Sequence, residues 1–174
     1  MNTDTRPPAT AGDTRRVAYA VVLVAIGVAL APYTSFPVGI AKINPTQHFI
    51  NVVAAVLLGP WWAMGVAFVI GVLRNVMGVG SLLAFPGGMI GAFLAGWLFV
   101  RFHSLYLCAA GEIMGTGLIA PVVSALFVAP VLMGKAIPLL ALVPSFLGST
   151  IVGAVMGVLA VRLLAQADMV ELQA

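Results

Sequence analysis

Six apolar runs, separated by glycines, prolines and short polar stretches, constrain this chain more than any other feature of its sequence. A helix needs about 20 apolar residues to cross a bilayer, and several of these runs reach that length. Only 7% of the 174 residues are charged and 62% are hydrophobic, whereas soluble domains contain roughly 25% charged residues. These polar side chains are too few to cover a water-facing surface. The sequence therefore excludes a soluble globular protein and predicts an all-α membrane protein.

We predict a bundle of six transmembrane helices. Their expected ranges are residues 17–31, 45–58, 61–77, 86–103, 105–132 and 139–165. Prolines interrupt two of these ranges, and such residues break or kink helices because they lack an N–H donor. We expect Pro121 and Pro130 to kink the fifth helix, and Pro144 to break or restart the sixth.

The second helix is unusually short. Asn44 and Pro45 form a cap and a first-turn proline, and Gly59 and Pro60 end the helical pattern. The intervening residues rise only about 21 Å, which is less than the bilayer core. Either the bilayer thins around this helix, or the helix starts below the membrane surface beneath a polar cavity. Its polar first turn favours the cavity.

The termini are expected on the cytoplasmic side of the cell membrane. We predict a disordered cytoplasmic tail over residues 1–16, a membrane domain over 17–165 and a short cytoplasmic tail over 166–174. An even number of spans places both tails on one side. That side carries five of the eight basic residues, and cytoplasmic loops are enriched in such residues.

The motifs of membrane enzymes are missing from the sequence. It contains no zinc-binding or serine-nucleophile motif, and its single cysteine, Cys108, lies inside an apolar run. The basic residues are scattered, which argues against nucleic acid as a partner. The phosphate-binding loop of ATPases is absent as well, so ATP-driven work would need a partner protein. We therefore expect no catalytic residue, no metal site and no cofactor.

Among the polar residues of the predicted spans, Glu112 costs the most free energy to place in a membrane. It lies inside the fifth span, where an unpaired acidic group costs about 2.5 to 3.5 kcal/mol. Two interpretations stay open. Glu112 contacts a ligand, or it pairs with a neighbouring helix.

A cluster of polar residues is expected at the outer mouth of the bundle. It comes from the start of the second helix and the end of the third, and its members are Lys42, Asn44, Thr46, Gln47, His48, Arg74 and Asn75. Alternatively, the two basic residues snorkel to the interface and the amides cap helices. His48 has no partner within reach by sequence, so a metal role is disfavoured. Trp61, Trp62 and Trp97 fit aromatic belts, or stack on a ring-shaped ligand.

The first span carries small residues four apart. Ala25 and Ala29 lie on one helical face, with Gly27 and Ala31 beside them. Small residues at this spacing allow another helix to approach closely. That helix belongs either to the same chain or to another subunit.

Four segments together resemble the ThiW family. They are residues 43–51 (INPTQHFIN), 73–75 (LRN), 83–88 (LAFPGG) and 111–117 (GEIMGTG), and the similarity extends from about Val17 to Leu164. This resemblance implies a substrate-binding S component of an energy-coupling-factor (ECF) transporter. Such a six-helix subunit captures a thiamine precursor, here expected to be hydroxyethylthiazole, and works with a transmembrane coupling subunit and two ATPases. Ala25 and Ala29 match the helix stripe by which S components dock, whereas Val21 departs from it.

Hydroxyethylthiazole is small, flat and uncharged, so an apolar pocket with a few orienting polar groups suits it. We expect hydrogen bonds to the ligand from Asn44, Gln47, His48, Asn75 and Glu112. Trp61 or Phe85 is expected to stack on the ring. The pyrimidine precursor and thiamine are alternative ligands. The alternative functions are a stand-alone proton-coupled transporter or channel, and a structural subunit of a membrane complex.

Overall fold

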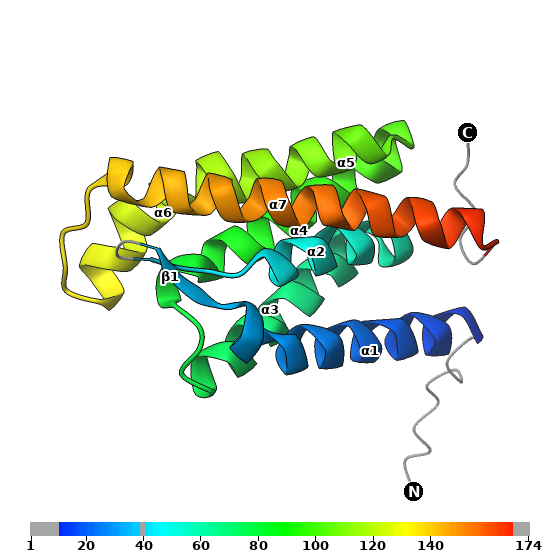
Figure 1. Cartoon of the computed structure of the whole chain (residues 1–174), viewed down its shortest axis with the longest axis horizontal. Coiled ribbons are helices and arrows are strands. Elements are labelled where there is room, and N and C mark those ends of the chain that lie inside the picture. Colours follow the sequence, from blue (N-terminus) through cyan, green and yellow to red (C-terminus); the bar gives the residue numbers. More distant parts are fainter. Residues whose placement is uncertain (1–10, 39–40, 169–174) are drawn as a thin grey trace, which may run out of the picture.

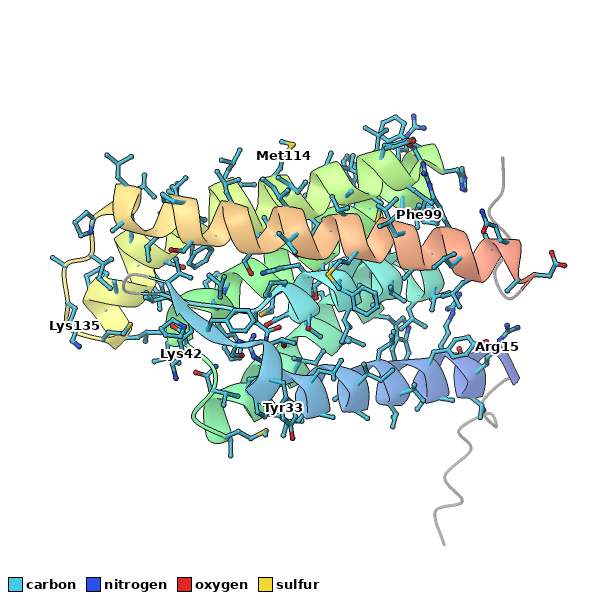
Figure 2. The ribbon with its side chains drawn as sticks, viewed as in Figure 1. Arg15, Tyr33, Lys42, Phe99, Met114 and Lys135 are labelled. Atoms are coloured by element: carbon cyan, nitrogen blue, oxygen red, sulfur yellow. The ribbon has the colours of Figure 1, made fainter. Side chains whose placement is uncertain are left out.

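The computed structural model describes residues 11–38 and 41–168, and it is a bundle of long helices (Figure 1). The start of α1 (Ala11–Thr34) and the end of α7 (Leu139–Gln166) lie at the same end of the bundle. Charged side chains mark both ends, with Lys42 and Lys135 at one end and Arg15 at the other (Figure 2). Between them the outward-facing side chains are mainly apolar, as a membrane requires.

All six expected helices are present. Besides α1 and α7, they are α2 (Pro45–Leu58), α3 (Pro60–Val76), α4 (Phe85–Phe102) and a composite fifth helix over residues 105–132. The fifth consists of α5 (Leu105–Glu112), the π-helical segment η2 (Ile113–Ile119), α6 (Ala120–Val123) and a second π-helical segment, η3 (Ser124–Leu132). Four helical stretches are long and apolar enough to cross a membrane, while α2 and α3 are shorter.

One of the three prolines, Pro144, behaves differently from the expectation. α7 continues through Pro144, so the predicted break there is wrong. Pro144 is in the second turn of α7, so its missing N–H removes one backbone hydrogen bond near the start of the helix and leaves the rest of the ladder intact. In the fifth helix, Pro121 is the second residue of α6 and Pro130 lies within η3. The wider π turns there relieve the clash between a proline ring and the preceding turn.

Helix α1 is longer at both ends than the sequence suggested. It begins at Ala11 instead of residue 17 and continues past Pro32 to Thr34. Residues 11–16, which we assigned to a disordered tail, are therefore helical. The remainder of that tail, residues 1–10, and residues 169–174 lie outside the described residues. A short antiparallel hairpin that we did not anticipate follows α1, formed by β1 (Phe36–Val38) and β2 (Ala41–Ile43).

Helix α2 occupies the centre of the bundle. It packs against α1, α3, α4 and α7, and residues on several of its faces, such as Ile50, Val52 and Ala54, are fully buried. A helix that is hydrophobic all round is one that its neighbours enclose. Because α2 is both short and enclosed, its first turn lies inside the protein, next to η1 (Leu82–Ala84) and the hairpin.

Glycines bring α4 and the fifth helix into backbone contact. A Cβ added at Gly115 would lie 2.6 Å from the Gly91 Cα atom and 2.8 Å from its nitrogen. Carbon atoms in proteins do not approach this closely, so any larger residue must push the two helices apart. This contact places the side chains that flank it on η2 against α4.

We expect Gly115→Ala to lower the free energy of unfolding by about 1 to 3 kcal/mol, because the added methyl group overpacks this contact. Gly148→Ala is the matched control, since a Cβ there meets nothing within 4 Å and alanine favours a helix. Thermal unfolding of the purified protein in detergent measures both. Equal unfolding temperatures for the two variants would contradict the contact.

Candidate functional site

The site lies at the first turn of α2, and Asn44 positions that turn. Its side-chain oxygen accepts a hydrogen bond from the Gln47 backbone N–H at 2.8 Å, which caps the helix. Its Nδ2 donates to Ser35 Oγ at 2.7 Å, and its backbone N–H donates to Ser149 Oγ at 3.1 Å. With these bonds made, Asn44 is buried. In this structure, therefore, the Asn44 side chain caps a helix, as the second interpretation of the amides states.

A buried carboxyl group lies at the floor of the site. Glu112 is 0% exposed, and its Oε1 atom lies 2.9 Å from His48 Nδ1, 3.0 Å from Asn51 Nδ2 and 3.0 Å from Thr116 Oγ1. The sequence showed no partner for His48, and the fold supplies one from 64 residues away. In this structure Glu112 therefore pairs with side chains of a neighbouring helix, α2, as the second interpretation of this residue states.

This cluster is anchored to the backbone of α4. Asn51 Nδ2 donates to the Gly88 carbonyl at 3.1 Å, and Thr116 Oγ1 donates to the Gly87 carbonyl at 2.8 Å. Two acceptor atoms, Asn51 Oδ1 and Glu112 Oε2, have no partner among the described residues. When a neutral His48 donates from Nδ1, its Nε2 atom is an acceptor. The cluster thus fixes the orientation of His48, which lines the cavity above it.

Arg74 forms the opposite wall of the site. It comes from the last turn of α3 and donates to Gln47 Oε1 and, at 3.3 Å, to Ser35 Oγ. Only 3% of its surface is exposed, so the alternative that it snorkels to the membrane interface is wrong. Its Nε atom has no partner among the described residues. An unpaired buried donor of this kind is expensive unless a ligand or water satisfies it.

Two small cavities adjoin these side chains. The first, of about 20 Å³, is lined by Lys42, Ile43, Asn44, Gln47, His48, Arg74, Ala84, Thr116, Ser145, Phe146 and Ser149. The second, of about 10 Å³, is lined by Gln47, Gly71, Arg74, Asn75, Gly80, Ser81, Ala84 and Phe85. The larger has room for about one water molecule. A ligand can enter only if the surrounding hairpin, η1 and helix ends move apart.

The structure brings most of the predicted site residues together, at different depths. Gln47 and His48 line the first cavity, and Glu112 lies behind His48. Asn75 and Phe85 line the second cavity, where Asn75 Nδ2 donates to the Gly71 carbonyl at 2.8 Å.

Trp61 does not join the site. It lies near the start of α3, whereas Arg74 ends that helix, so roughly 20 Å separates them along the helix axis. Its side chain is 68% exposed, and its ring contacts Phe93 with the ring centroids 4.9 Å apart. The expectation that Trp61 stacks on a ligand in this site is therefore wrong.

Several site residues were not predicted as such. Asn51 and Thr116 are the main ones, and both had a usable signal in their spacing. Asn51 lies three residues after His48 and Thr116 four after Glu112, so each pair shares a helical face. Ser35, Ser145 and Ser149 carry no comparable signal, because only the tertiary structure brings them near α2.

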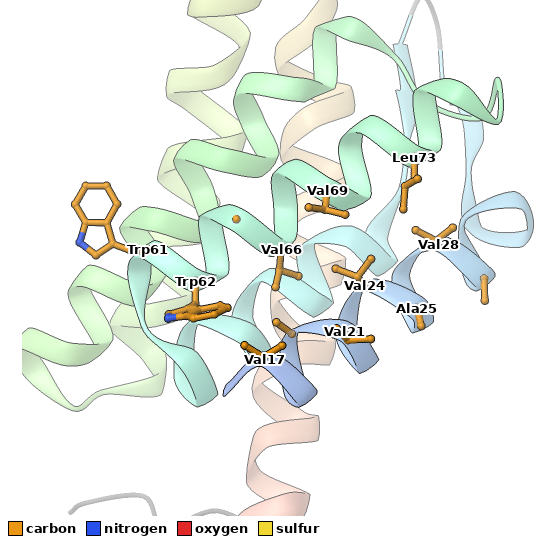
Figure 3. A pocket seen from close by; sticks show the side chains of 13 residues that line it. Val17, Val21, Val24, Ala25, Val28, Trp61, Trp62, Val66, Val69 and Leu73 are labelled. Carbon is orange, nitrogen blue, oxygen red and sulfur yellow. The ribbon is translucent and has the colours of Figure 1, made fainter. Parts of the chain in front are cut away.

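A separate apolar groove runs between α1 and α3 (Figure 3). It has a volume of about 790 Å³, and Ala25, Ala29, Trp61 and Trp62 are among the residues that line it. Both alanines are exposed. Among the described residues, therefore, no helix covers the face of α1 that carries Ala25 and Ala29.

The hydrogen bonds around Glu112 lead to a prediction about the stability of the fold. We expect Glu112→Ala to lower the free energy of unfolding by about 3 kcal/mol, because it leaves buried donors on α2 without an acceptor. Glu112→Gln is the control, since it retains an oxygen in place of Oε1 and should lose less. Unfolding in detergent measures both variants. An alanine variant as stable as the wild type would show that the cluster does not hold the helices together.

The chain is similar to a family of transporters in sequence and to two solved structures in fold. The family described as "Thiamine-precursor transporter protein (ThiW)" matches residues 17–167. The S component of a bacterial ECF transporter has a TM-score of 0.73 at 19% identity, covering 88% of this chain and 97% of that one. The S component for biotin from an ECF-type ABC transporter has a TM-score of 0.68 at 17% identity, covering 92% and 95%. No curated protein matches the sequence significantly.

Proposed function

The chain belongs to the ThiW family of thiamine-precursor transporter proteins, and we propose that it captures hydroxyethylthiazole in the site at the start of α2. As a family member it is a multi-pass membrane protein that serves transport and is not an enzyme. The shared fold with S components supports the same role for this chain. The observation that carries the proposal is the buried polar site inside an otherwise apolar bundle, with one donor and two acceptors that have no partner among the described residues.

The lining of the site suits this ligand. Hydroxyethylthiazole has a flat ring, one ring nitrogen that accepts a hydrogen bond, and a hydroxyl that both donates and accepts. Gln47 and His48 supply polar groups on one wall, and Phe146 supplies an apolar surface. Phe85 is the aromatic side chain we propose to stack on the ring once the two cavities join. Asn44, Asn75 and Glu112 then act mainly by holding the first turn of α2, the end of α3 and the ring of His48.

Transport itself requires further subunits in this proposal. The sequence has no phosphate-binding loop, so two partner ATPases and a transmembrane coupling subunit supply the work. The groove beside Ala25 and Ala29 is the proposed docking surface, because small exposed side chains admit a partner helix. The termini are proposed to lie in the cytoplasm, where the ATPases act.

Isothermal titration of the purified chain with hydroxyethylthiazole tests the ligand, with the pyrimidine precursor and thiamine measured in parallel. We expect binding of the thiazole, and a loss of about tenfold or more in His48→Ala and Gln47→Ala because each removes a polar contact. Trp61→Ala should bind as the wild type does, since Trp61 lies far from the site. Binding of one of the other compounds in place of the thiazole would overturn the ligand assignment. A folded sample that binds none of them would favour the alternative of a structural subunit.

Substitution on α1 tests docking. We expect Ala25→Trp and Ala29→Trp to abolish copurification with the coupling subunit and ATPases while ligand affinity is unchanged, because indole rings block helix approach. Ile26→Trp is the matched control, since Ile26 is exposed on α1 but does not line the groove. Uptake in cells that lack the ATPases would instead indicate a transporter that works alone.

A further inference from the structure

The charges around the cavity are unbalanced. Arg74 is buried and lines both small cavities. Its recorded partners are the neutral oxygens of Gln47 and Ser35, and no carboxylate pairs with it in the described part of the chain. Lys42, also cationic, lines the first cavity and donates from Nζ to the Gly78 carbonyl at 2.7 Å. The walls of the cavity therefore carry positive charge.

Glu112 offers no carboxylate oxygen to a ligand in the cavity. It is absent from the lining, and its Oε1 atom already contacts three neighbouring side chains. Its Oε2 atom faces α4, since a Cβ added at Gly91 would lie 2.6 Å from it. None of the described residues that line the cavities is acidic, and each cavity has a single aromatic residue in its lining. A cationic ligand would find neither a carboxylate nor an aromatic cage.

We infer that Arg74 determines selectivity, donating its free Nε–H to an acceptor on an uncharged ligand and excluding thiazolium cations. This inference rests on the proposed function. In an uncharged thiazole the ring nitrogen is such an acceptor. In a thiazolium that nitrogen carries a third substituent in place of its lone pair, so the acceptor is lost and a permanent positive charge appears beside Arg74. The thiazole ring of thiamine is a thiazolium, so the site takes the precursor and rejects the finished vitamin.

A purely structural role for Arg74 makes a different prediction. Arg74 also connects α3 to Gln47 on α2 and to Ser35 after α1. If that were its whole role, substitution would weaken every ligand by a similar factor. Selectivity, the ratio of two affinities, is the readout that separates the roles.

The experiment titrates the full chain in detergent with hydroxyethylthiazole and with its N-methylated thiazolium. For the wild type we expect a preference on the order of 100-fold for the uncharged compound. Arg74→Gln should weaken the uncharged compound roughly tenfold and reduce the preference at least as much. Arg74→Lys keeps the charge without the planar fork, so it should bind more weakly yet keep the preference. Arg101→Gln is the matched control. Arg101 is exposed in the last turn of α4, whereas the first residue of that helix, Phe85, lines the second cavity.

Two outcomes overturn the inference alone. One is a wild type that binds both compounds equally well, and this comparison needs no variant. The other is a folded Arg74→Gln protein with an unchanged preference. If that variant does not fold, the wild-type preference and its retention in Arg74→Lys decide. Failure of the folded wild type to bind either compound overturns the proposed function, and the inference with it.

Discussion

The structure depends on one buried carboxyl group. Glu112 lies on the fifth helix in the middle of an apolar bundle, where an unpaired acidic group is expensive. The cost is met by donors on α2, because His48 and Asn51 both reach Oε1. Thr116, one turn further along, contacts the same oxygen and the backbone of α4. Three segments are thus held together by polar contacts where lipid supplies no hydrophobic driving force.

This arrangement requires close helix contacts, and small residues provide them. Gly91 and Gly115 allow α4 and η2 to touch through their backbones. Gly87 and Gly88 present their carbonyl groups to Thr116 and Asn51. The small residues of α4 therefore do more than fill space. They expose backbone acceptors to the polar cluster and bring it under the first turn of α2.

The position of α2 turns this packing into a binding site. Because α2 is short and central, its polar first turn lies inside the protein, and the end of α3 brings Arg74 to the same level. The amides there also serve the fold, since Asn44 caps α2 and Gln47, which lines the cavity, accepts a hydrogen bond from Arg74. Among the described residues, the buried side-chain donor and acceptor atoms without partners are consequently few and well defined, which favours a small ligand with few polar groups.

The sequence by itself determined the class of protein, the six helices, the short second helix and the location of the polar residues along the chain. These features follow from local composition and spacing, which act without reference to the rest of the fold. The tertiary structure alone decided which of those residues meet. The pairing of His48 with Glu112 and the burial of Arg74 depend on how the helices pack. Helical periodicity states which face a side chain occupies, but not which helix that face contacts or how deeply it is buried.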